Sequence, residues 1–414
     1  MSTPLPKNIG IIGHDLIGAL NGIGVYKATG TIPTVQLDGQ IPENLDVVAV
    51  TTMNKIATPR MAYKQMRKAI AKCNGRYLSF YEAHSLMGNI SADIKAIIDE
   101  LQPEKLILCT AWPELNNYIR DAYSYIGNIP VNKSIRASDA ITPIRESYLP
   151  RIVFEYSGLT SKVINLTEVE RGADYITGLI NNSPEKVIIC DATRPHHLKS
   201  IAETVIRNRD SWISCGSRGL LREIPPLLGY HGQKHVMNPL TNREPVLLVL
   251  GSMSDVTAVQ LATSAEKGLL YPVLIEPADV WHKKERLPKI HRLAREAGQQ
   301  ISRGNNVAIS SVSSRFIPQF RKTVAYLLSQ IARIVIEEYG IKVLFINGAD
   351  TAYAFCQTME IEKLEIRGGI TSRFCPILLD GYSRSGNNYS VCLNPGSYGD
   401  EYTIVQALRF LRED

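Results

Sequence analysis

The sequence offers no segment that could anchor the chain in a membrane or direct it to secretion. No apolar run approaches the roughly 20 residues that a helix needs to cross a bilayer. The opening residues, Met1 to Lys7, carry two prolines and lack the apolar core of a signal peptide. We therefore expect a cytoplasmic protein that has no membrane partner.

Cysteines at the spacing of metal ligands or of a disulfide framework are also lacking. The chain has seven cysteines, an odd number, and no two of them are spaced as zinc ligands are. Several lie in apolar runs, as Cys190 does after Ile188 and Ile189. This pattern is typical of small buried side chains in a reducing compartment and argues against a disulfide scaffold.

Long runs of one charge sign are absent as well. The net charge is +6 with 21% charged residues, and basic residues are interleaved with acidic ones, as in residues 283–286. A protein that binds nucleic acid would gather its cations on one face or along one helix, so nucleic acid is not an expected partner. The mild positive charge would instead attract a small anionic substrate.

What the sequence does contain is a regular alternation of two kinds of segment. Short aliphatic runs, such as 8–13 and 187–190, are followed by longer amphipathic stretches, such as 16–28 and 196–206. Alternation of predicted strands and helices is typical of α/β architecture with largely parallel sheets. With 414 residues and 44% hydrophobic content, the chain is long enough for two such domains.

A stretch rich in proline and glycine interrupts this alternation at residues 225–245. Periodicity is weak there, and a strong predicted strand restarts the pattern at 246–250. We interpret the interruption as the connection between two domains. The expected organisation is a first domain over 1–235, a linker over 236–245 and a second domain over 246–414.

Two glycine-rich turns in the second half each follow an apolar run and precede a helix-like stretch. The first covers 347–352 and the second 394–400. Small residues at a strand-to-helix turn leave backbone N–H groups free, and the helix dipole favours an anion there. The turns thus predict a site for nucleotide phosphates, although glycines also serve simply to make tight connections. A dinucleotide-binding dehydrogenase is disfavoured, because Gly13 and Gly18 after the first strand have the wrong spacing for its fingerprint.

Together with a third turn, these motifs resemble those of the four-carbon acid sugar kinases in order and spacing. Gly-Ser-Met-Ser at 251–254 is similar to the family's Gly-Ser-Cys-Ser. Asn-Gly-Ala-Asp-Thr-Ala at 347–352 is similar to its Gly-Gly-Asp-Thr-Ala, and Asn-Pro-Gly-Ser-Tyr-Gly at 394–399 to its Lys-Pro-Gly-Gly-Phe-Gly. Members of that family phosphorylate small sugar acids such as threonate, erythronate and oxo-tetronate with ATP. The resemblance implies a first domain for the acid, a second domain for ATP and an active site in the interdomain cleft.

The resemblance also implies which residues of the second domain bind ATP and Mg²⁺. Asp350 is expected to be catalytic by holding the metal ion beside the phosphates, although an aspartate at this place could also cap a helix. The residues expected to contact the nucleotide are Ser252, Ser254, Asn347, Gly348, Ala349, Thr351, Asn394, Pro395, Gly396, Ser397, Tyr398 and Gly399.

In the first domain the corresponding motifs are present but altered. Gly-His-Asp-Leu-Ile-Gly-Ala at 13–19 resembles the family's Ala-Asp-Asp-x-Thr-Gly-Ala. Asp15 is therefore the expected general base, which accepts the proton of the acceptor hydroxyl. An aspartate before the helix predicted at 16–28 could equally serve as its N-cap. The residues expected to contact the acceptor are His14, Lys55, Glu82, His84, Gly88 and Asn89.

The loop at 80–89 departs most from the family, whose Lys-Lys-x-Asp-Ser-Thr-Leu-Arg-Gly-Asn is retained mostly at one end. An arginine binds a carboxylate through two charge-assisted hydrogen bonds, and Met87 in its place can make neither. Three interpretations stay open: a kinase of small sugar acids or related polar metabolites, a kinase with an acceptor outside the four-carbon acids, or a non-catalytic nucleotide- or metabolite-binding protein. The resemblance further implies a homodimer.

Overall fold

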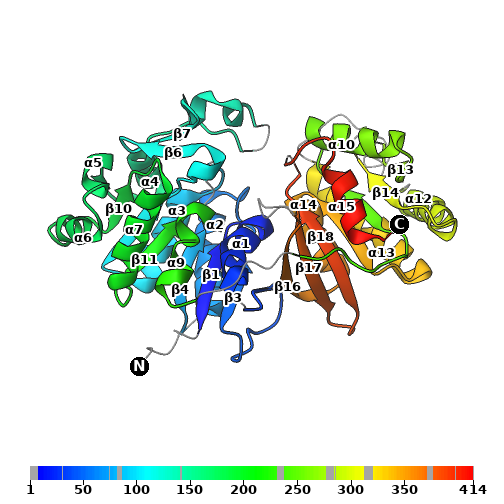
Figure 1. The fold of residues 1–414 in the computed structure, drawn as a ribbon, viewed down its shortest axis with the longest axis horizontal. Helices are drawn as coiled ribbons and strands as arrows, with labels where there is room; N and C mark the ends of the chain where they lie inside the picture. Colours follow the sequence, from blue (N-terminus) through cyan, green and yellow to red (C-terminus); the bar gives the residue numbers. More distant parts are fainter. Residues whose placement is uncertain are drawn as a thin grey trace. The chain divides into compact units, whose positions relative to one another are not determined.

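The computed structural model comprises two compact α/β units, one formed by residues 1–36 and 40–234 and the other by residues 37–39 and 235–414. Figure 1 shows the helices and strands of both units. The structure describes residues 8–29, 31–73, 75–81, 86–139, 142–230, 237–276, 284, 286–311, 320–370, 376–396 and 398–413.

The first unit is built on a sheet in which neighbouring strands pair in parallel. Its strands run in the order β2-β3-β1-β4-β11-β5-β10-β9. Aliphatic runs such as Ile9–Gly13 and Val187–Cys190 are buried at every position, as expected for parallel strands with helices on both faces. The strands are β1 (Ile9–Gly13), β2 (Thr34–Gln36), β3 (Val47–Thr51), β4 (Tyr77–Tyr81), β5 (Lys105–Cys109), β9 (Ser161–Ile164), β10 (Val187–Cys190) and β11 (Trp212–Gly216).

Helices connect these strands and cover the sheet (Figure 1). The longer helices bury one apolar stripe, as α2 does with Ala62, Met66 and Ile70. The helix predicted at 16–28 is shorter than expected, because α1 ends at Ile23 and the chain continues as a 3-10 helix. The helices are α1 (Leu16–Ile23), α2 (Pro59–Lys72), α3 (Ile90–Leu101), α4 (Leu149–Ser157), α5 (Leu166–Val169), α6 (Ala173–Asn181), α7 (Pro195–Arg207), α8 (Arg218–Leu221) and α9 (Ile224–Leu227).

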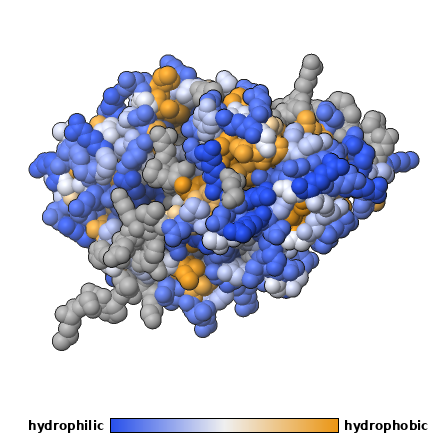
Figure 2. All heavy atoms as spheres, turned by 45° about the vertical axis from the view of Figure 1, so that its right-hand side comes forward, coloured by the Kyte–Doolittle hydropathy of each residue, from blue (hydrophilic) through white to orange (hydrophobic). Residues whose placement is uncertain are grey.

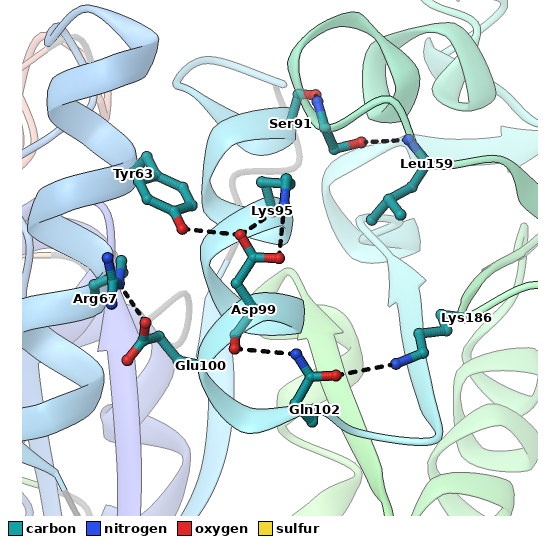
Figure 3. Close-up of polar contacts among 10 residues, drawn as sticks. Tyr63, Arg67, Ser91, Lys95, Asp99, Glu100, Gln102, Leu159 and Lys186 are labelled. Carbon is teal, nitrogen blue, oxygen red and sulfur yellow. Dashed lines mark hydrogen bonds and ion pairs between the residues drawn. The ribbon is translucent and has the colours of Figure 1, made fainter.

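Polar contacts fix α3 against its neighbour α2 (Figure 3). Asp99 of α3 accepts hydrogen bonds from Tyr63 of α2 at 2.8 Å and from Lys95 at 2.6 Å. One residue further along α3, Arg67 of α2 pairs with Glu100. Such partly exposed pairs contribute at most about 1 kcal/mol each to stability. These contacts fix the position of α3. Its N-terminus follows Gly88 and Asn89, which the sequence predicts to contact the acceptor.

A small antiparallel sheet, which the sequence did not predict, follows β5. The buried carboxylate of Asp191, directly after β10, accepts hydrogen bonds from the backbone N–H groups of Asp121 (2.7 Å) and Ala122 (2.9 Å). These bonds tie the small sheet to the large one. Its strands and the 3-10 turns that follow are β6 (Asn117–Arg120), β7 (Tyr123–Ile126), β8 (Ile129–Pro130), η3 (Val131–Lys133) and η4 (Ile135–Ser138).

The second unit has a mixed sheet in the order β13-β14-β12-β15-β18-β17-β16. Pairing is parallel from β13 to β18 and antiparallel between β18, β17 and β16. The prediction of α/β architecture with largely parallel sheets is therefore confirmed. The strands are β12 (Leu247–Leu250), β13 (Tyr271–Leu274), β14 (Val307–Ser310), β15 (Val343–Asn347), β16 (Ile361–Gly369), β17 (Ile377–Ser383) and β18 (Asn388–Asn394).

The longer helices of the second unit also bury apolar residues along one side. The long helix α13 buries a stripe of apolar residues from Val324 to Val335. Next to it, the core includes Leu250, Phe345 and Ile404. The helices are α10 (Asp255–Glu266), α12 (Arg286–Ser302), α13 (Arg321–Tyr339), α14 (Ala349–Thr358) and α15 (Thr403–Leu411).

Within the described ranges, no helix combines the length and apolar character that crossing a membrane requires. On the face drawn in Figure 2, hydrophilic residues predominate and hydrophobic ones form separate patches among them. Large apolar side chains are exposed in both units, for example Ile32 at 61% and Leu287 at 64%. Scattered residues of this kind are ordinary on protein surfaces.

Gly216, at the end of β11, permits a close approach to the neighbouring strand β5. A Cβ atom there would lie 2.2 Å from the carbonyl oxygen of Cys109. We expect Gly216→Ala to lower the free energy of unfolding by about 1–3 kcal/mol, because backbone has to move to admit the methyl group. Gly178→Ala in α6 is the control, since a Cβ atom there meets nothing within 4 Å and removes a glycine from a helix interior. Urea denaturation compares the two variants, and equal stabilities would contradict the packing argument.

Candidate functional site

Polar side chains gather at the carboxyl ends of β1 and β4. These strands are parallel neighbours, but α1 leads from β1 toward β2 on one side, whereas α3 leads from β4 toward β5 on the other. Where the connections of adjacent parallel strands diverge, a crevice forms at their carboxyl ends, and ligands of α/β proteins bind there. Residues 13–15 and 86–89 flank this point, which we call the β1–β4 site.

Asp15 follows β1 and is only 6% exposed. Its Oδ1 accepts a hydrogen bond from the Gly18 N–H at 2.6 Å, so Asp15 is the N-cap of α1. Its Oδ2 lies 3.4 Å from Lys55 Nζ and 3.7 Å from His14 Nε2. The two roles that the sequence suggested are thus compatible, because one oxygen caps the helix and the other faces Lys55 and His14.

Electrostatics keep Asp15 ionised despite its burial. Burial alone would raise the pKa of the carboxyl, but Lys55, His14 and the Gly18 N–H together outweigh it, so the pKa lies below its usual value. Burial lowers the pKa of His14, with Lys55 adding to this effect and Asp15 opposing it. These shifts favour the carboxylate form of Asp15 and the neutral form of His14.

The loop after β3, which carries Lys55, is fixed by hydrogen bonds to its backbone. The His14 carbonyl accepts bonds from the N–H groups of Asn54 (2.9 Å) and Lys55 (3.3 Å). Asn89 donates from Nδ2 to the carbonyl oxygens of Asn54 (2.8 Å) and Ala57 (3.0 Å). One function of Asn89 is thus to position the loop that brings the Lys55 ammonium group to Asp15.

Asn54 and Asp93 belong to this network and were missed by the sequence analysis. Both are completely buried, and Asn54 Nδ2 donates to Asp93 Oδ1 at 2.6 Å. The signal in the sequence was an acidic residue within the apolar stretch 90–98 of α3. A carboxylate on a buried helix face is retained only with a polar partner, although the sequence does not say which partner.

The segment before α3 packs over His14. Gly88 has φ +133°, a conformation that L side chains rarely adopt, and a Cβ atom there would lie 3.9 Å from the His14 ring. The ring of Tyr81 stacks against His14 with a centroid distance of 5.7 Å. Glu82 and His84, two of the predicted acceptor contacts, lie outside the described residues. The other predicted acceptor contacts all come together in the β1–β4 site.

In the second unit, the connections diverge in the same way at the carboxyl ends of β12 and β15. These strands are parallel neighbours, while α10 leads from β12 toward β13 and α14 leads from β15 toward β16 at the opposite edge. The predicted nucleotide-binding turns 251–254 and 347–351 follow these two strands, and 394–400 follows the adjacent β18. We call this cluster of three turns the β12–β15 site.

Small residues let the three turns of the β12–β15 site approach one another closely. A Cβ atom on Gly251 would lie 1.9 Å from Thr351 Oγ1. Gly396 has φ +108°, and a Cβ atom there would lie 2.9 Å from Ser252 Oγ. The Gly348 N–H donates to the carbonyl of the last residue of β18 at 2.9 Å. The glycines are therefore required by the packing of the turns, whatever else binds there.

Two residues of α10 that the sequence analysis did not single out tie the turns together. Thr257 Oγ1 donates to the Gly396 carbonyl at 2.9 Å and accepts a hydrogen bond from Asn347 Nδ2 at 3.3 Å. Gln260 Nε2 donates at 3.0 Å to two carbonyl oxygens of the turn 394–400. Thr257 and Gln260 are three residues apart, so both polar side chains lie on one face of α10. This spacing is the signal in the sequence that could have identified them.

Several predicted nucleotide contacts hold the β12–β15 site in shape. Asn347 and Asn394 are completely buried, and their Oδ1 atoms have no hydrogen-bond partner among the described residues. Ser254 caps α10, and its Oγ lies 3.2 Å from that of Ser252. Ser397 lies outside the described part of the chain.

Asp350 lies in the first turn of α14 with its side chain 43% exposed. Its Oδ2 is 3.4 Å from Nε of Arg321, the first residue of α13, which the sequence analysis did not identify. Magnesium prefers one or two carboxylates together with waters and phosphates. A partly exposed carboxylate beside the N–H groups of a helix N-terminus fits such an ion together with a bound phosphate.

A separate cluster joins Glu170, His196 and His197, whose ligand atoms lie within 4.8 Å of one another. His197 Nδ1 accepts hydrogen bonds from the N–H groups of Thr193 (3.1 Å) and Arg194 (3.3 Å) before α7. A neutral ring therefore carries its proton on Nε2, which donates to Glu170 at 2.6 Å. Since a metal ion would need the Nε2 lone pair, these bonds favour a helix cap over a metal site.

Comparison with known proteins identifies both units. A family model for a sugar-binding N-terminal domain matches residues 9–224, and one for a nucleotide-binding C-terminal domain matches residues 247–404. A D-erythronate kinase of Heliobacterium modesticaldum is 24% identical, over 87% of this chain and 88% of that protein. A D-threonate kinase of Salmonella typhimurium is 24% identical, over 79% and 78%, and a 3-oxo-tetronate kinase of Escherichia coli is 25% identical, over 61% and 68%.

Solved structures share the fold. A Salmonella typhimurium LT2 protein provisionally described as a tRNA synthase has a TM-score of 0.78 at 20% identity, covering 98% of this chain and 99% of its own. A Haemophilus influenzae protein of family DUF1537 has a TM-score of 0.73 at 17% identity, covering 97% and 100%. At these identities the likeness establishes the fold alone.

Lys55→Met is expected to raise the pKa of Asp15, because Lys55 is the strongest of the groups that hold this pKa down. A carboxyl with a depressed pKa stabilises the fold above its unfolded pKa and loses this contribution as the pH falls through its folded pKa. The variant should therefore lose stability at higher pH than the wild type during acid titration. Carboxyl NMR of Asp15 measures the shift, and Lys95→Met, which removes the partner of Asp99, is the control. An unchanged pKa of Asp15 would show that the ion pair does not form in solution.

Proposed function

Because the chain belongs to the four-carbon acid sugar kinase family, we propose that it transfers the γ-phosphoryl group of ATP to a hydroxyl of a small sugar acid. The observation that carries the proposal is the buried carboxylate of Asp15 in the β1–β4 site. Its Oδ2 faces Lys55 and His14, a combination suited to binding and deprotonating a hydroxyl of an anionic acceptor. The glycine-rich β12–β15 site supplies the matching place for a phosphate chain.

In the β12–β15 site, the N-termini of α10 and α14 are proposed to bind the phosphates through backbone N–H groups. Asp350 would hold Mg²⁺, which supplies charge neutralisation at the phosphate oxygens when bound. Arg321, which pairs with Asp350, offers a further cation for the same oxygens. Phosphoryl transfer depends mainly on positioning and charge neutralisation, and these groups provide both.

In the β1–β4 site, Asp15 is proposed to act as the general base. The acceptor oxygen forms a bond to the γ-phosphorus, the bond from that phosphorus to the bridging oxygen breaks to release ADP, and the hydroxyl proton passes to Asp15 Oδ2. Since Oδ1 is held by the Gly18 N–H, the base presents one oxygen in one orientation. The low pKa keeps Asp15 in the form that can accept a proton at neutral pH.

A non-catalytic nucleotide- or metabolite-binding protein is the second candidate function. The observation in its favour is the loop 80–89, in which the lysines, the aspartate and the arginine of the family motif are replaced. A kinase with an acceptor outside the four-carbon acids accounts for the same replacements. The proposal includes a cytoplasmic location, which rests on the composition of the sequence, and a homodimer, which rests on the family.

ADP release is expected with ATP, Mg²⁺ and at least one acid among D-erythronate, D-threonate and 3-oxo-tetronate. Asp15→Asn should lower kcat by about 10²–10⁴-fold, because an amide cannot accept the hydroxyl proton, and should leave ATP affinity unchanged. Asp174→Asn, at an exposed carboxylate of α6, is the matched control and should retain full activity. ATP binding without turnover on any acid would favour the non-catalytic alternative.

Asp350→Asn should weaken ATP binding in the presence of Mg²⁺ by about tenfold, the equivalent of about 1.4 kcal/mol. The reason is that a neutral amide is a poorer ligand than a carboxylate for a hard cation. Calorimetric titrations with and without Mg²⁺ measure the effect, which should vanish without the metal ion. Glu296→Gln on α12 removes the same charge at the surface and serves as the control. An unchanged Mg²⁺-dependent affinity would exclude Asp350 as the metal ligand.

A further inference from the structure

A cation that the sequence analysis did not identify lies beside the β1–β4 site. Arg136 belongs to the 3-10 turn η4, and its Nη1 is 3.9 Å from Met87 Sδ. The side chain is partly buried, and none of the carboxylates in the described ranges lies within ion-pair distance of it. A thioether sulfur is a weak acceptor, so the contact with Met87 leaves most of the hydrogen-bonding capacity of the guanidinium unused.

The backbone that carries Arg136 is held in place by its own turn. Ser134 Oγ accepts a hydrogen bond from the Arg136 N–H at 3.2 Å and donates to the Val131 carbonyl at 2.7 Å. The Arg136 carbonyl accepts a bond from the Ile144 N–H at 3.2 Å. Among the described residues, Arg136 is thus a partly buried cation on a fixed backbone without a carboxylate partner. Such a cation is costly in a folded protein, and its cost is offset when an anionic ligand binds.

A chain of contacts through Met87, Gly88 and His14 connects Arg136 with the proposed general base. Met87 precedes Gly88, which packs over the His14 ring. His14 Nδ1 is buried without a hydrogen-bond partner among the described residues, while Nε2 of the same ring lies 3.7 Å from Asp15. Lys55 forms an ion pair with the carboxylate of Asp15, with Nζ 3.4 Å from Oδ2. Within the described part of the chain, the β1–β4 site thus has one cation paired with the proposed base, and a second cation, Arg136, without a carboxylate partner.

Building on the kinase function proposed above, we propose that Arg136 binds the carboxylate of the acceptor and thereby selects acids over neutral polyols. A guanidinium offers two parallel N–H donors that match a carboxylate, and the unbranched, adaptable Met87 side chain lies against it without competing for the ligand. Lys55 is less suited to this task because it already pairs with Asp15. In this assignment the hydroxyl end of the acceptor faces Asp15 and His14.

The test compares Arg136→Gln with Arg145→Gln, which removes the same charge from an exposed position of the same segment. Binding of sugar acids and of their neutral polyols, such as D-erythronate and erythritol, is measured by calorimetry without ATP, and KM and kcat are measured by ADP release. Loss of a charge-assisted hydrogen-bonded pair corresponds to about a 10- to 100-fold effect. Arg136→Gln should weaken acid binding and raise KM for the acid by that factor, with kcat and the KM for ATP little changed. Erythritol binding should not change.

A charge-relocation variant makes the test specific. Introducing Met87→Arg into Arg136→Gln places a guanidinium at the neighbouring position, so acid binding should return. Unchanged acid affinity in Arg136→Gln, an equal loss in Arg145→Gln, or no binding of any sugar acid to the wild type would each overturn the assignment. Selective binding of acids that depends on Arg136, but without ADP release, would support the assignment while refuting the kinase function. Turnover of the acids that does not change in Arg136→Gln would support the kinase function and refute the assignment of Arg136.

Discussion

The divergence of connections between adjacent parallel strands is the constraint on which both candidate sites depend. β1 and β4 in the first unit, and β12 and β15 in the second, are hydrogen-bonded neighbours whose following helices lead to opposite sides of the sheet. Because these helices diverge, neither covers the gap between the two strand ends. Loops from several strands fill the edges of that gap, and the polar residues of each unit that carry the proposed chemistry lie on these loops.

In the first unit, the cost of burying a carboxylate at this gap is offset in two ways. One oxygen of Asp15 is satisfied by the first turn of α1, and the other by the charge of Lys55. Lys55 is in turn positioned by hydrogen bonds from the loop backbone to His14 and by the side chain of Asn89. Hydrogen bonds from the loop backbone and from the Asn89 amide therefore orient Lys55 toward Asp15.

In the second unit, the packing of the three turns against one another requires particular residues whether or not a ligand binds. Gly251 is required because Thr351 occupies the space of any side chain there, and Thr257 joins two of the turns by hydrogen bonds. These contacts leave backbone N–H groups of α14 and the Asp350–Arg321 pair at the open edge. The same residues thus account for the tight strand-to-helix turns and are compatible with the anion site proposed above, so the two explanations offered by the sequence are not exclusive.

The sequence by itself determined the features that depend on local patterns. Alternating aliphatic and amphipathic runs indicated the α/β class and the bounds of the strand at 187–190, since burial on both faces leaves a continuous apolar run. Glycines marked the strand-to-helix turns, and an aspartate before the helix predicted at 16–28 marked the N-cap of α1. These properties are readable because each is set by neighbours within a few residues along the chain.

Only the tertiary structure decided what distant residues do to one another. The bond between Asn54 and Asp93 joins residues 39 positions apart, and the contact between Arg136 and Met87 joins residues 49 positions apart. The sequence shows only that Met87 stands where the family motif has an arginine, so a cation is lacking at this position of the chain. In the fold, the guanidinium of Arg136, from another element, lies 3.9 Å from the Met87 sulfur. The position of a charged residue along the chain does not specify where its charge will lie in space.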